Sequence, residues 1–235
     1  KMKETGVDAC LIPTSDFHGS EYVGDYFKCR EYISGFTGSA GTLVVTLDGA
    51  GLWTDGRYFL QAAKQLSGSG ITLMRERQPG VPSIEEYLKT TLKKGETLGF
   101  DGRCIMAEYA DTLITQLNAL GVAVRTDIDL PGAVWEKRPP LSAQAVWPLP
   151  VEYAGESSES KIKRVREFLS EKKAQYLLLT SLEDIAWLLN MRGNDVESTP
   201  VILSYLLLGQ QEIIWYVQEA CLSEKIKILL EMQGI

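Results

Sequence analysis

The chain has 235 residues and is acidic, with 31 Asp and Glu against 24 Lys and Arg. This balance argues against a nucleic-acid-binding protein, which normally carries a basic face. The longest apolar run, near 201–208, is far shorter than the ~18 residues that indicate a membrane span. The four cysteines lie far apart without a CxxC pair, so we expect reduced thiols in a cytoplasmic protein, with neither a zinc knuckle nor a disulfide framework.

The first predicted strand, 8–13, leads into a polar loop, 14–21, that holds the only histidine of the chain. His18 stands near Asp16, Ser20 and Glu21, a composition that raises the question of a metal site or a catalytic triad. A metal site usually takes three or four protein ligands, and a Ser two positions from a His rarely reaches nucleophile geometry. The favoured interpretation of His18 is a hydrogen-bonded loop organiser.

Three glycines spaced three apart, at 35, 38 and 41, precede a predicted strand at 43–46. A phosphate-binding loop is the functional alternative for this segment. It lacks the Lys of a P-loop, its spacing is not GxGxxG, and dinucleotide-binding loops follow a strand instead of preceding one. We therefore interpret it as a tight connection in which small residues let backbone segments pack closely.

The stretch 51–65 passes from strand to turn to helix within a few residues. Asp55 and Gly56 are a turn signal, and apolar residues from Tyr58 to Ala63 recur at helical spacing, which predicts one buried helix face. In one interpretation Asp55 caps the helix and Arg57 is solvated. In the other, the strand end presents Trp53, Asp55 and Arg57 as a polar cluster for a ligand or a partner.

The following segments alternate strand and helix, which favours an α/β layer with a mixed sheet. They are a strand at 71–74, a helix introduced by Pro82 and Ser83 that runs through 92, a strand at 97–100, a helix at 107–120 and a strand at 123–125. The strand at 97–100 ends in a second Asp-Gly-Arg turn, 101–103, and shared turn chemistry is enough to explain this echo.

A proline-rich segment separates two predicted domains, with domain I at 1–130, the linker at 131–156 and domain II at 157–235. Proline stiffens the linker, and Trp135 and Trp147 are expected to pin it to a neighbouring surface. Domain II opens with a helix whose predicted apolar face includes Ile162 and Phe168.

Domain II repeats the design of domain I in the order strand, helix, glycine turn, strand. Leu177–Ser181 (LLLTS) matches part of CLIPTS at Cys10–Ser15, and a strand at 212–217 and a helix at 223–232 follow. Arg192, Asn194 and Asp195 are expected to brace the second glycine turn by hydrogen bonds. No strand follows the last helix, so domain II is expected to be truncated.

Four segments taken in order carry a more specific signal: DFHGSEY at 16–22, ISGFTGSAGT at 33–42, WTDGRYFLQAAKQ at 53–65 and EDIAWLLNMRGNDVESTPV at 183–201. Together they resemble aminopeptidase P, the Xaa-Pro aminopeptidase of the creatinase and prolidase group. The resemblance covers essentially the whole chain and is nearer to the three-domain cytosolic type than to prolidase or creatinase. It implies two related creatinase N-terminal-type domains, each a mixed β-sheet with flanking helices.

The resemblance also implies a metallopeptidase, a hydrolase that releases an amino-terminal residue before proline. Its catalytic domain binds two metal ions, usually manganese, through two Asp, one His and two Glu. With His18 as its single histidine, this chain cannot furnish that set. The resemblance therefore implies a non-catalytic front portion, inactive alone, with no catalytic residue, metal or cofactor of its own.

In such enzymes the first domain approaches the active site of the partner subunit and limits access to narrow, proline-bearing peptides. By this resemblance we expect Trp53, Asp55 and Arg57 to contact substrate or the dimer interface, with His18 and Glu21 as weaker candidates. The expected partners are the protein's own C-terminal catalytic domain, a second subunit and proline-containing peptides, with no nucleic acid and no membrane.

Two alternatives from other functional classes remain. One is a stand-alone module that binds peptide or protein with no catalytic domain attached. The other is a metal nuclease that uses Asp55 and Asp101 at adjacent strand ends, and the negative charge of the chain argues against it.

Overall fold

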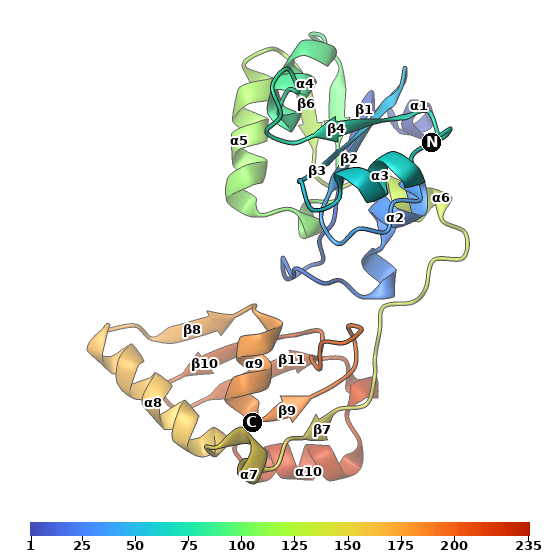
Figure 1. Ribbon diagram of the computed structural model, residues 1–235. Coiled ribbons are helices and arrows are strands. Elements are labelled where there is room, and N and C mark those ends of the chain that lie inside the picture. Colours follow the sequence, from blue (N-terminus) through green and yellow to red (C-terminus); the bar gives the residue numbers. More distant parts are fainter. The chain divides into compact units, whose positions relative to one another are not determined.

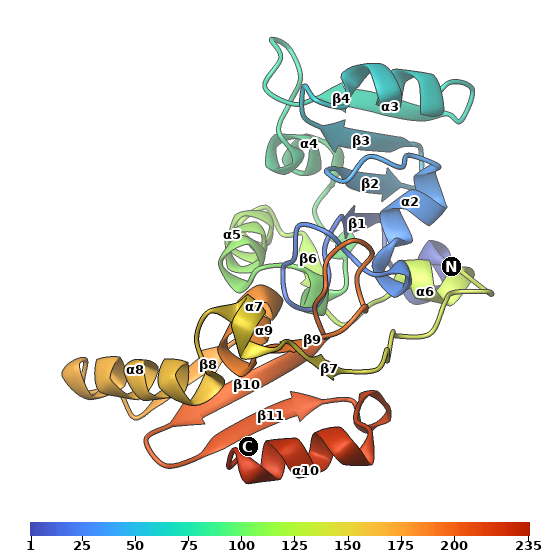
Figure 2. The ribbon, with the colours of Figure 1, turned by 60° about the horizontal axis from the view of Figure 1, so that its bottom comes forward.

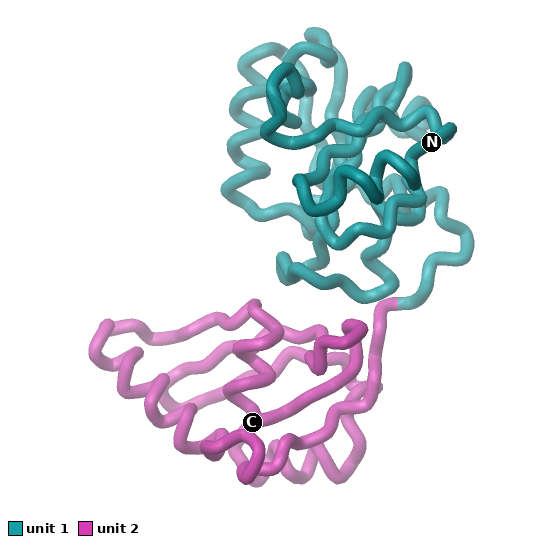
Figure 3. The backbone as a smooth tube through the Cα atoms, in the orientation of Figure 1, with its two compact units in different colours: residues 1–140 teal, residues 141–235 magenta.

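The computed structural model describes residues 1–235, which divide into two compact units, Lys1–Pro140 and Leu141–Ile235, called unit 1 and unit 2 (Figure 3). The division falls inside the predicted linker 131–156, which contains short elements: α6 (Leu130–Val134), β7 (Trp147–Pro148) and α7 (Val151–Ala154). Trp135 stacks on Tyr32 with ring centroids 4.4 Å apart, which is the pinning expected of it. The predicted linker range thus belongs partly to each unit.

Unit 1 is built on a six-stranded sheet with the order β4-β3-β2-β1-β5-β6 (Figure 1). Its strands are β1 (Ala9–Pro13), β2 (Thr42–Thr46), β3 (Ala50–Thr54), β4 (Ile71–Arg75), β5 (Thr97–Gly99) and β6 (Ala123–Arg125). β2 is antiparallel to both of its neighbours, whereas β3 with β4, β1 with β5, and β5 with β6 pair in parallel. The predicted mixed sheet is confirmed.

Helices cover both faces of this sheet (Figure 1). The helices of unit 1 are α1 (Met2–Thr5), α2 (Cys29–Ser34), α3 (Phe59–Gln65), α4 (Ile84–Thr91), α5 (Ala107–Asn118) and α6. Leu88 of α4 and Leu113 of α5 share an apolar cluster with alternate strand residues such as Leu11. The neighbouring residue Ile12 faces the opposite cluster, which includes Ala62 of α3, as the two-residue period of a strand requires.

The helix after β3 differs from its prediction at its start and on its buried face. α3 begins at Phe59, and Tyr58 is its N-cap without a side-chain cap. Asp55 does not cap the helix, because its Oδ1 accepts the backbone N–H of Arg57 in a turn that closes before the helix starts. Ala62 is buried but Ala63 is exposed, so the apolar face is narrower than predicted. The later helix α4 starts as predicted, with a capping box between Ser83 and Glu86.

Unit 2 contains a three-stranded antiparallel sheet with the order β11-β10-β8 and a short β7-β9 ladder (Figure 2). Its other elements are α8 (Ser158–Glu171), β8 (Tyr176–Leu179), α9 (Leu182–Leu189), β9 (Met191–Arg192), β10 (Ser204–Gly209), β11 (Ile213–Val217) and α10 (Glu224–Met232). The order β8-α9-β10-β11-α10 repeats the order β1-α2-β2-β3-α3 of unit 1. The predicted duplication of one α/β design is confirmed at this level.

α8, α9 and α10 bury their apolar residues in one cluster with the sheet of unit 2. Ser157 caps α8, and Ile162 and Leu169 are buried as predicted. Phe168 was expected on the same face but is 55% exposed. Six residues beyond Ile162, it points well away from that face at 3.6 residues per turn, and the Lys172 Nζ lies 5.4 Å from its ring centroid.

Among the helices, none combines the length and the apolar character that crossing a membrane would require.

Candidate functional site

The parallel pairing in unit 1 brings the carboxyl ends of β1, β3, β4, β5 and β6 to the same edge of the sheet, called here the carboxyl edge. Only β2 runs the opposite way. In open α/β sheets the loops at this edge form the usual ligand-binding crevice. Of the predicted residues, Trp53 lies in β3 near this edge, and the other four follow β1 or β3 in loops at the edge.

Asp55 and Arg57, which follow β3, form a two-pronged ion pair. Arg57 donates from Nε to Asp55 Oδ1 at 3.0 Å and from an Nη atom to Asp55 Oδ2 at 2.8 Å. The side chain of Arg57 remains 62% exposed. These hydrogen bonds from Arg57, on the side chain and on the backbone, hold the pKa of Asp55 below its usual value. The pair is charge-neutral and presents its guanidinium to solvent.

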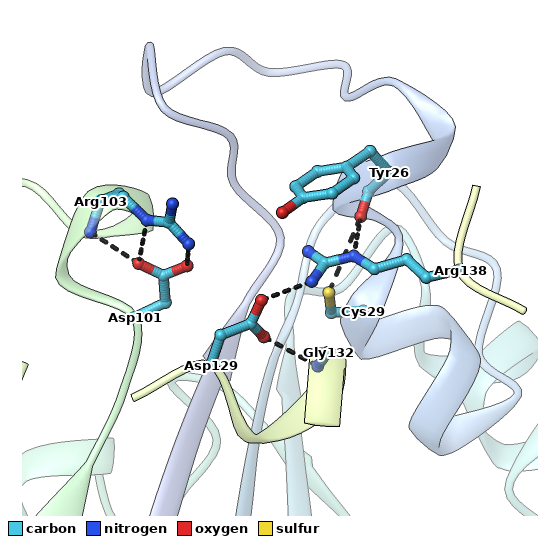
Figure 4. Close-up of polar contacts among 7 residues, drawn as sticks. All are labelled: Tyr26, Cys29, Asp101, Arg103, Asp129, Gly132 and Arg138. Carbon is cyan, nitrogen blue, oxygen red and sulfur yellow. Dashed lines mark hydrogen bonds and ion pairs between the residues drawn. The ribbon is translucent and has the colours of Figure 1, made fainter. Parts of the chain in front are cut away.

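The second Asp-Gly-Arg turn, after β5, repeats this geometry almost atom for atom. Arg103 donates from Nε to Asp101 Oδ1 at 2.9 Å and from Nη to Oδ2 at 2.8 Å (Figure 4). At the end of β6, Arg125 makes a similar fork to Asp127, with the order of acid and base reversed. Three Asp–Arg forks thus lie along the carboxyl edge. The repeated DGR triplet was the sequence signal for the second fork, and nothing comparable marked the third.

Trp53 does not join this cluster. Its side chain is 1% exposed and packs edge-on against Tyr87, with ring centroids 5.0 Å apart. Its indole N–H donates to the carbonyl of Pro82 at 2.9 Å. Trp53 is therefore a core residue, because strand alternation turns it toward α4 while the turn that follows carries Asp55 and Arg57 outward.

The loop after β1 is organised by Asp16, which sequence reasoning had treated only as a neighbour of His18. Asp16 is buried, and its Oδ1 accepts the backbone N–H groups of His18 and Ser20 at 2.8 and 2.9 Å. Burial alone would raise the pKa of Asp16, but the hydrogen bonds from His18 and Ser20 outweigh it and lower the pKa. The His18 ring is also buried, with Nδ1 3.8 Å from Asp16 Oδ2. His18 is thus part of the loop's interior, not of its surface.

Glu21 is exposed at the end of the same loop. The fork with Asp55 is the main cause of the raised pKa of Arg57, and the negative charge of Glu21 contributes to it. Of the five predicted site residues, the structure therefore links Asp55, Arg57 and Glu21 electrostatically.

A small cavity of about 30 Å³ lies beside Asp101 of the second fork, and Asp129, Cys10, Cys29 and Cys104 also contribute to its lining. It has room for a water molecule or two and not for a substrate. Burial raises the pKa of each thiol, to about 12 for Cys10, 11 for Cys29 and 12 for Cys104. Thiols that stay protonated at neutral pH are poor nucleophiles, so this cavity is not a nucleophilic site.

Arg138 closes this region from the end of unit 1 (Figure 4). It pairs with Asp129, donates from Nε to the carbonyl of Tyr26 at 2.8 Å, and stacks its guanidinium 3.7 Å from the centroid of the Tyr26 ring. Asp129 in turn accepts the N–H of Gly132 and so caps α6. The segment before Pro140 is thereby fastened to the body of unit 1.

The glycine-rich connection at 33–42 is tight, as interpreted from the sequence. A Cβ on Gly38 would lie 2.3 Å from the Phe36 ring, and one on Gly41 would lie 3.0 Å from the carbonyl of Trp53. The buried Arg30 donates to the carbonyls of Phe36 and Gly38, so carbonyl oxygens of this turn face a cation of the protein itself. This arrangement does not provide the N–H cradle that a phosphate needs.

Sequence models described as creatinase/prolidase N-terminal domain match residues 1–138 and residues 137–235. The chain belongs to the creatinase/prolidase N-terminal domain family. Together the two matched ranges cover both units. The fold class expected from the sequence, two such domains with mixed α/β structure, is confirmed.

Relatives over the whole chain agree with the resemblance to aminopeptidase P. The chain is 36% identical to Xaa-Pro aminopeptidase 1 of Dictyostelium discoideum, covering 96% of this chain and 37% of that protein. It is 39% identical to a probable Xaa-Pro aminopeptidase P of Laccaria bicolor, covering 98% of this chain and 36% of that protein. The chain thus spans little more than a third of the length of these curated relatives.

A solved structure is similar over the same extent. It is the crystal structure of X-prolyl aminopeptidase from Caenorhabditis elegans, described as a cytosolic enzyme with a di-nuclear active site. The sequence identity is 34%, the TM-score is 0.90, and the match covers 97% of this chain and 37% of that chain.

The residues of this chain do not fit a di-nuclear metal centre. No group of three or more His, Cys, Asp or Glu side chains is arranged so that it could hold a metal ion. The carboxylates at the carboxyl edge are instead engaged by Arg57, Arg103 and Arg125. No step of metal-dependent chemistry is assigned to these residues.

Three residues of unit 2, Arg192, Asn194 and Asp195, were expected to brace the glycine turn by hydrogen bonds, and two of them do so. Asp195 is buried, and its Oδ2 accepts the N–H of Leu203 while its Oδ1 accepts the N–H of Gln144, both at 2.9 Å. Arg192 donates to the carbonyls of Ala186 and Met191. Asn194 is exposed at the surface. The region is structural and holds no exposed fork like that of Arg57.

Proposed function

We propose that this protein is the non-catalytic N-terminal region of an Xaa-Pro aminopeptidase, a hydrolase that releases the residue preceding proline. The observation that carries the proposal is the match to X-prolyl aminopeptidase over 97% of this chain, with a TM-score of 0.90. The catalytic part, with two metal ions that we propose to be manganese, lies outside these residues. The relative described as cytosolic supports a cytoplasmic location.

The proposed role of unit 1 is to contribute to dimerisation and to a wall that limits which peptides reach the active site. Support comes from the three Asp–Arg forks at the carboxyl edge. The fork to Asp55 uses Nε and one Nη atom of Arg57, so the remaining N–H groups of the exposed guanidinium can contact a peptide carboxylate or an acidic partner while the fork is kept. Arg presents a planar fork that suits such two-pronged contacts.

Within this proposal the five predicted residues take different parts. Arg57, Asp55 and Glu21 are the contact residues, since all three reach the surface and interact electrostatically. His18 and Trp53 are buried, so their part is to position the loop after β1 and the strand β3. The proposed partners are the catalytic domain of the same polypeptide, a second subunit and proline-containing peptides.

The test uses the full-length protein with Arg57→Ala. We expect kcat/KM for peptides longer than tripeptides to fall about tenfold, the loss of roughly 1.4 kcal/mol that one charge-assisted contact supplies, with metal content unchanged. Arg164→Ala is the matched control, because Arg164 makes an equally exposed fork to Glu156 in unit 2. Equal kinetics for wild type and Arg57→Ala on all peptide lengths would remove Arg57 from the site.

The competing interpretation is a stand-alone binding module, and the reading frame after Ile235 separates the two. The proposal requires an Asp, Asp, His, Glu, Glu ligand series there. It also requires that residues 1–235 alone, with added manganese, hydrolyse no Xaa-Pro peptide. Turnover that follows the purified chain and disappears with a chelator would contradict it.

A further inference from the structure

Three Asp-Gly pairs lie in turns of unit 1, at positions 48 and 49, 55 and 56, and 101 and 102. Asp-Gly is the dipeptide most prone to isomerise, because glycine has no side chain to hinder attack by its own backbone nitrogen on the preceding carboxyl group. The rate depends on how freely that carboxyl group and that nitrogen move. The structure around each pair therefore sets how fast it reacts.

The chemistry is an internal rearrangement that needs no reagent other than water. The backbone nitrogen of the glycine attacks Cγ of the protonated aspartate side chain, a C–N bond forms, and the carboxyl hydroxyl leaves with the amide proton as water. A water molecule then adds to the main-chain carbonyl carbon of the aspartate in the cyclic imide, and the original C–N bond breaks. An isoaspartyl residue of unchanged mass remains.

The first pair is unrestrained at both reacting groups. Asp48 is exposed in the turn between β2 and β3, and its side chain has no hydrogen-bond or ion-pair partner. The N–H of Gly49 donates to the hydroxyl of Thr46, at 3.2 Å, within the same turn. A Cβ built on Gly49 would have no atom within 4 Å, so there is room for the imide ring.

The second pair is restrained at its carboxylate by an Asp–Arg fork. Both oxygens of Asp55 accept from the Arg57 side chain, and Oδ1 also accepts the backbone N–H of Arg57. A carboxyl group held at both oxygens has to leave the fork before its carbon can accept the nitrogen of Gly56. The hydrogen bonds from Arg57 also lower the pKa of Asp55, which reduces the protonated fraction that can lose water.

The third pair is restrained at both reacting groups. The Asp101 side chain is 17% exposed, against 36% for Asp55. Burial by itself raises the pKa of Asp101, but the hydrogen bonds from Arg103 outweigh it and lower the pKa. The N–H of Gly102 donates to the carbonyl of Thr126 at 2.8 Å, and a Cβ on Gly102 would lie 2.9 Å from that oxygen. The attacking nitrogen is thus engaged, and the imide ring has little room.

We propose that isoaspartate forms at Asp48 in the native protein, and that the Asp–Arg forks protect the two Asp-Gly turns of the carboxyl edge from the same reaction. The expected order of rates is Asp48, then Asp55, then Asp101. The forks thus have a chemical role that depends on no ligand or partner. The unprotected turn precedes β3 and lies at the end of that strand opposite to the carboxyl edge, so its isomerisation leaves the edge intact.

The first experiment ages the purified protein at neutral pH and then digests it, after denaturation, with a protease that cleaves before aspartate but not before isoaspartate. The uncleaved fraction should rise at least about fivefold faster at Asp48 than at Asp55, the factor that corresponds to a well-formed exposed ion pair. Protein aged in guanidinium chloride is the control, because it has no forks and its three pairs should react at similar rates. Equal rates in the folded protein, or the same differences in the denaturant, would overturn the proposal.

The second experiment removes one fork. Arg57→Ala should raise the rate of isoaspartate formation at Asp55 about fivefold, toward the rate of the unprotected pair. Arg125→Ala is the matched control and should change none of the rates, because the aspartate of its fork, Asp127, is followed by Ile128 and not by glycine. An unchanged rate at Asp55 in Arg57→Ala would overturn the proposal. Neither experiment measures peptidase activity, so either can fail while the proposed function stands.

Discussion

Each unit buries a cation at the end of one helix, the helix that follows β1 in unit 1 and β8 in unit 2, but the cation comes from a different place in each unit. In unit 1 the cation is Arg30, which lies on α2 and donates to the carbonyls of Phe36 and Gly38 just beyond that helix. In unit 2 it is Lys161, which lies on α8 and donates to the carbonyl of Trp187 at 2.8 Å and to Asn190 Oδ1 at 2.7 Å. Both side chains are almost fully buried.

The comparison shows that the helix end requires a buried hydrogen-bond donor, and that residues at different places in the chain can supply it. The last carbonyls of a helix, and those of the turn that follows it, lack partners within the helix and carry partial negative charge. A buried cation can therefore be satisfied by neutral oxygens, although burial lowers the pKa of Arg30 to about 10 and lowers that of Lys161 as well. The duplicated fold kept the requirement while the residue that meets it changed.

Removing the cation of unit 1 should have the largest effect. Arg30→Met leaves the buried carbonyls of Phe36 and Gly38 without their donor, and each unsatisfied group costs roughly 1–3 kcal/mol, so we expect a loss of about 3 kcal/mol or more. Urea unfolding followed by hydrogen exchange at β1 and β2 measures it. Arg30→Lys should recover only part, because one ammonium group does not span the same set of acceptors. Equal loss of protection in unit 2 would show that the two units do not unfold separately.

Removing the cation of unit 2 should cost less. Lys161→Met takes one donor from Trp187 and one from Asn190, but Asn190 still donates to the carbonyl of Glu156. We expect a loss of about 2 kcal/mol, read from hydrogen exchange at β8 and β10. Lys163→Met, at an exposed position on the same helix, should change stability by less than about 0.5 kcal/mol. Equal losses of stability in Lys161→Met and Lys163→Met would show that Lys161 does not stabilise the end of α9.

Removing the charge of Asp16, which holds the loop after β1, should give the smallest effect on stability, and that effect should depend on pH in the acid range. Asp16 has a lowered pKa in the folded protein, so it contributes stability above its unfolded value of ~3.9 that is lost as the pH falls through the folded value. Asp16→Asn keeps the oxygen that accepts from His18 and Ser20 but removes the charge. We expect it to be less stable than wild type by about 1 kcal/mol at neutral pH.

This difference in stability between wild type and Asp16→Asn should shrink as the pH falls below ~4, because Asp16 of the wild type then takes up a proton and becomes neutral, as the Asn side chain always is. Chemical unfolding at a series of pH values measures it. A difference that stays constant across the acid range would assign the effect of the substitution to geometry and not to charge. Asp195→Asn in unit 2 removes a second buried carboxylate that accepts backbone N–H groups, and its loss of stability at neutral pH can be compared with that of Asp16→Asn.

Most secondary structure could be predicted because its signals are local. Ser83, Ser157 and Ser223 each cap the helix that was predicted to follow them. The strand at 123–125 has the predicted bounds. Phe168 was placed on the wrong face because a helix whose apolar stripe is read from few residues leaves neighbouring positions ambiguous.

The candidate site could be predicted only in part. Asp55 and Arg57 were found because the turn, the helix start and the family motif coincide within a few residues. The same reasoning gave Trp53 a surface role, since it could not show that Tyr87 of α4 and Pro82, just before α4, contact the indole. Asp55 and Asp101 were placed at adjacent strand ends in the nuclease alternative, but β2 and β1 lie between β3 and β5, and the fork of Arg125 was not recognised, because both points depend on strand order.

The sequence by itself determined the helix caps, the turns, the duplicated order of elements and the family, since each of these depends on residues close together in the chain or on long motifs. Only the tertiary structure decided which side chains meet. Asp55 and Asp101 share an edge because β1 pairs with β2 on one side and β5 on the other, a long-range choice that no local pattern contains. Strand alternation turns Trp53 toward α4 in the core, and the turn after β3 carries Arg57 to the surface.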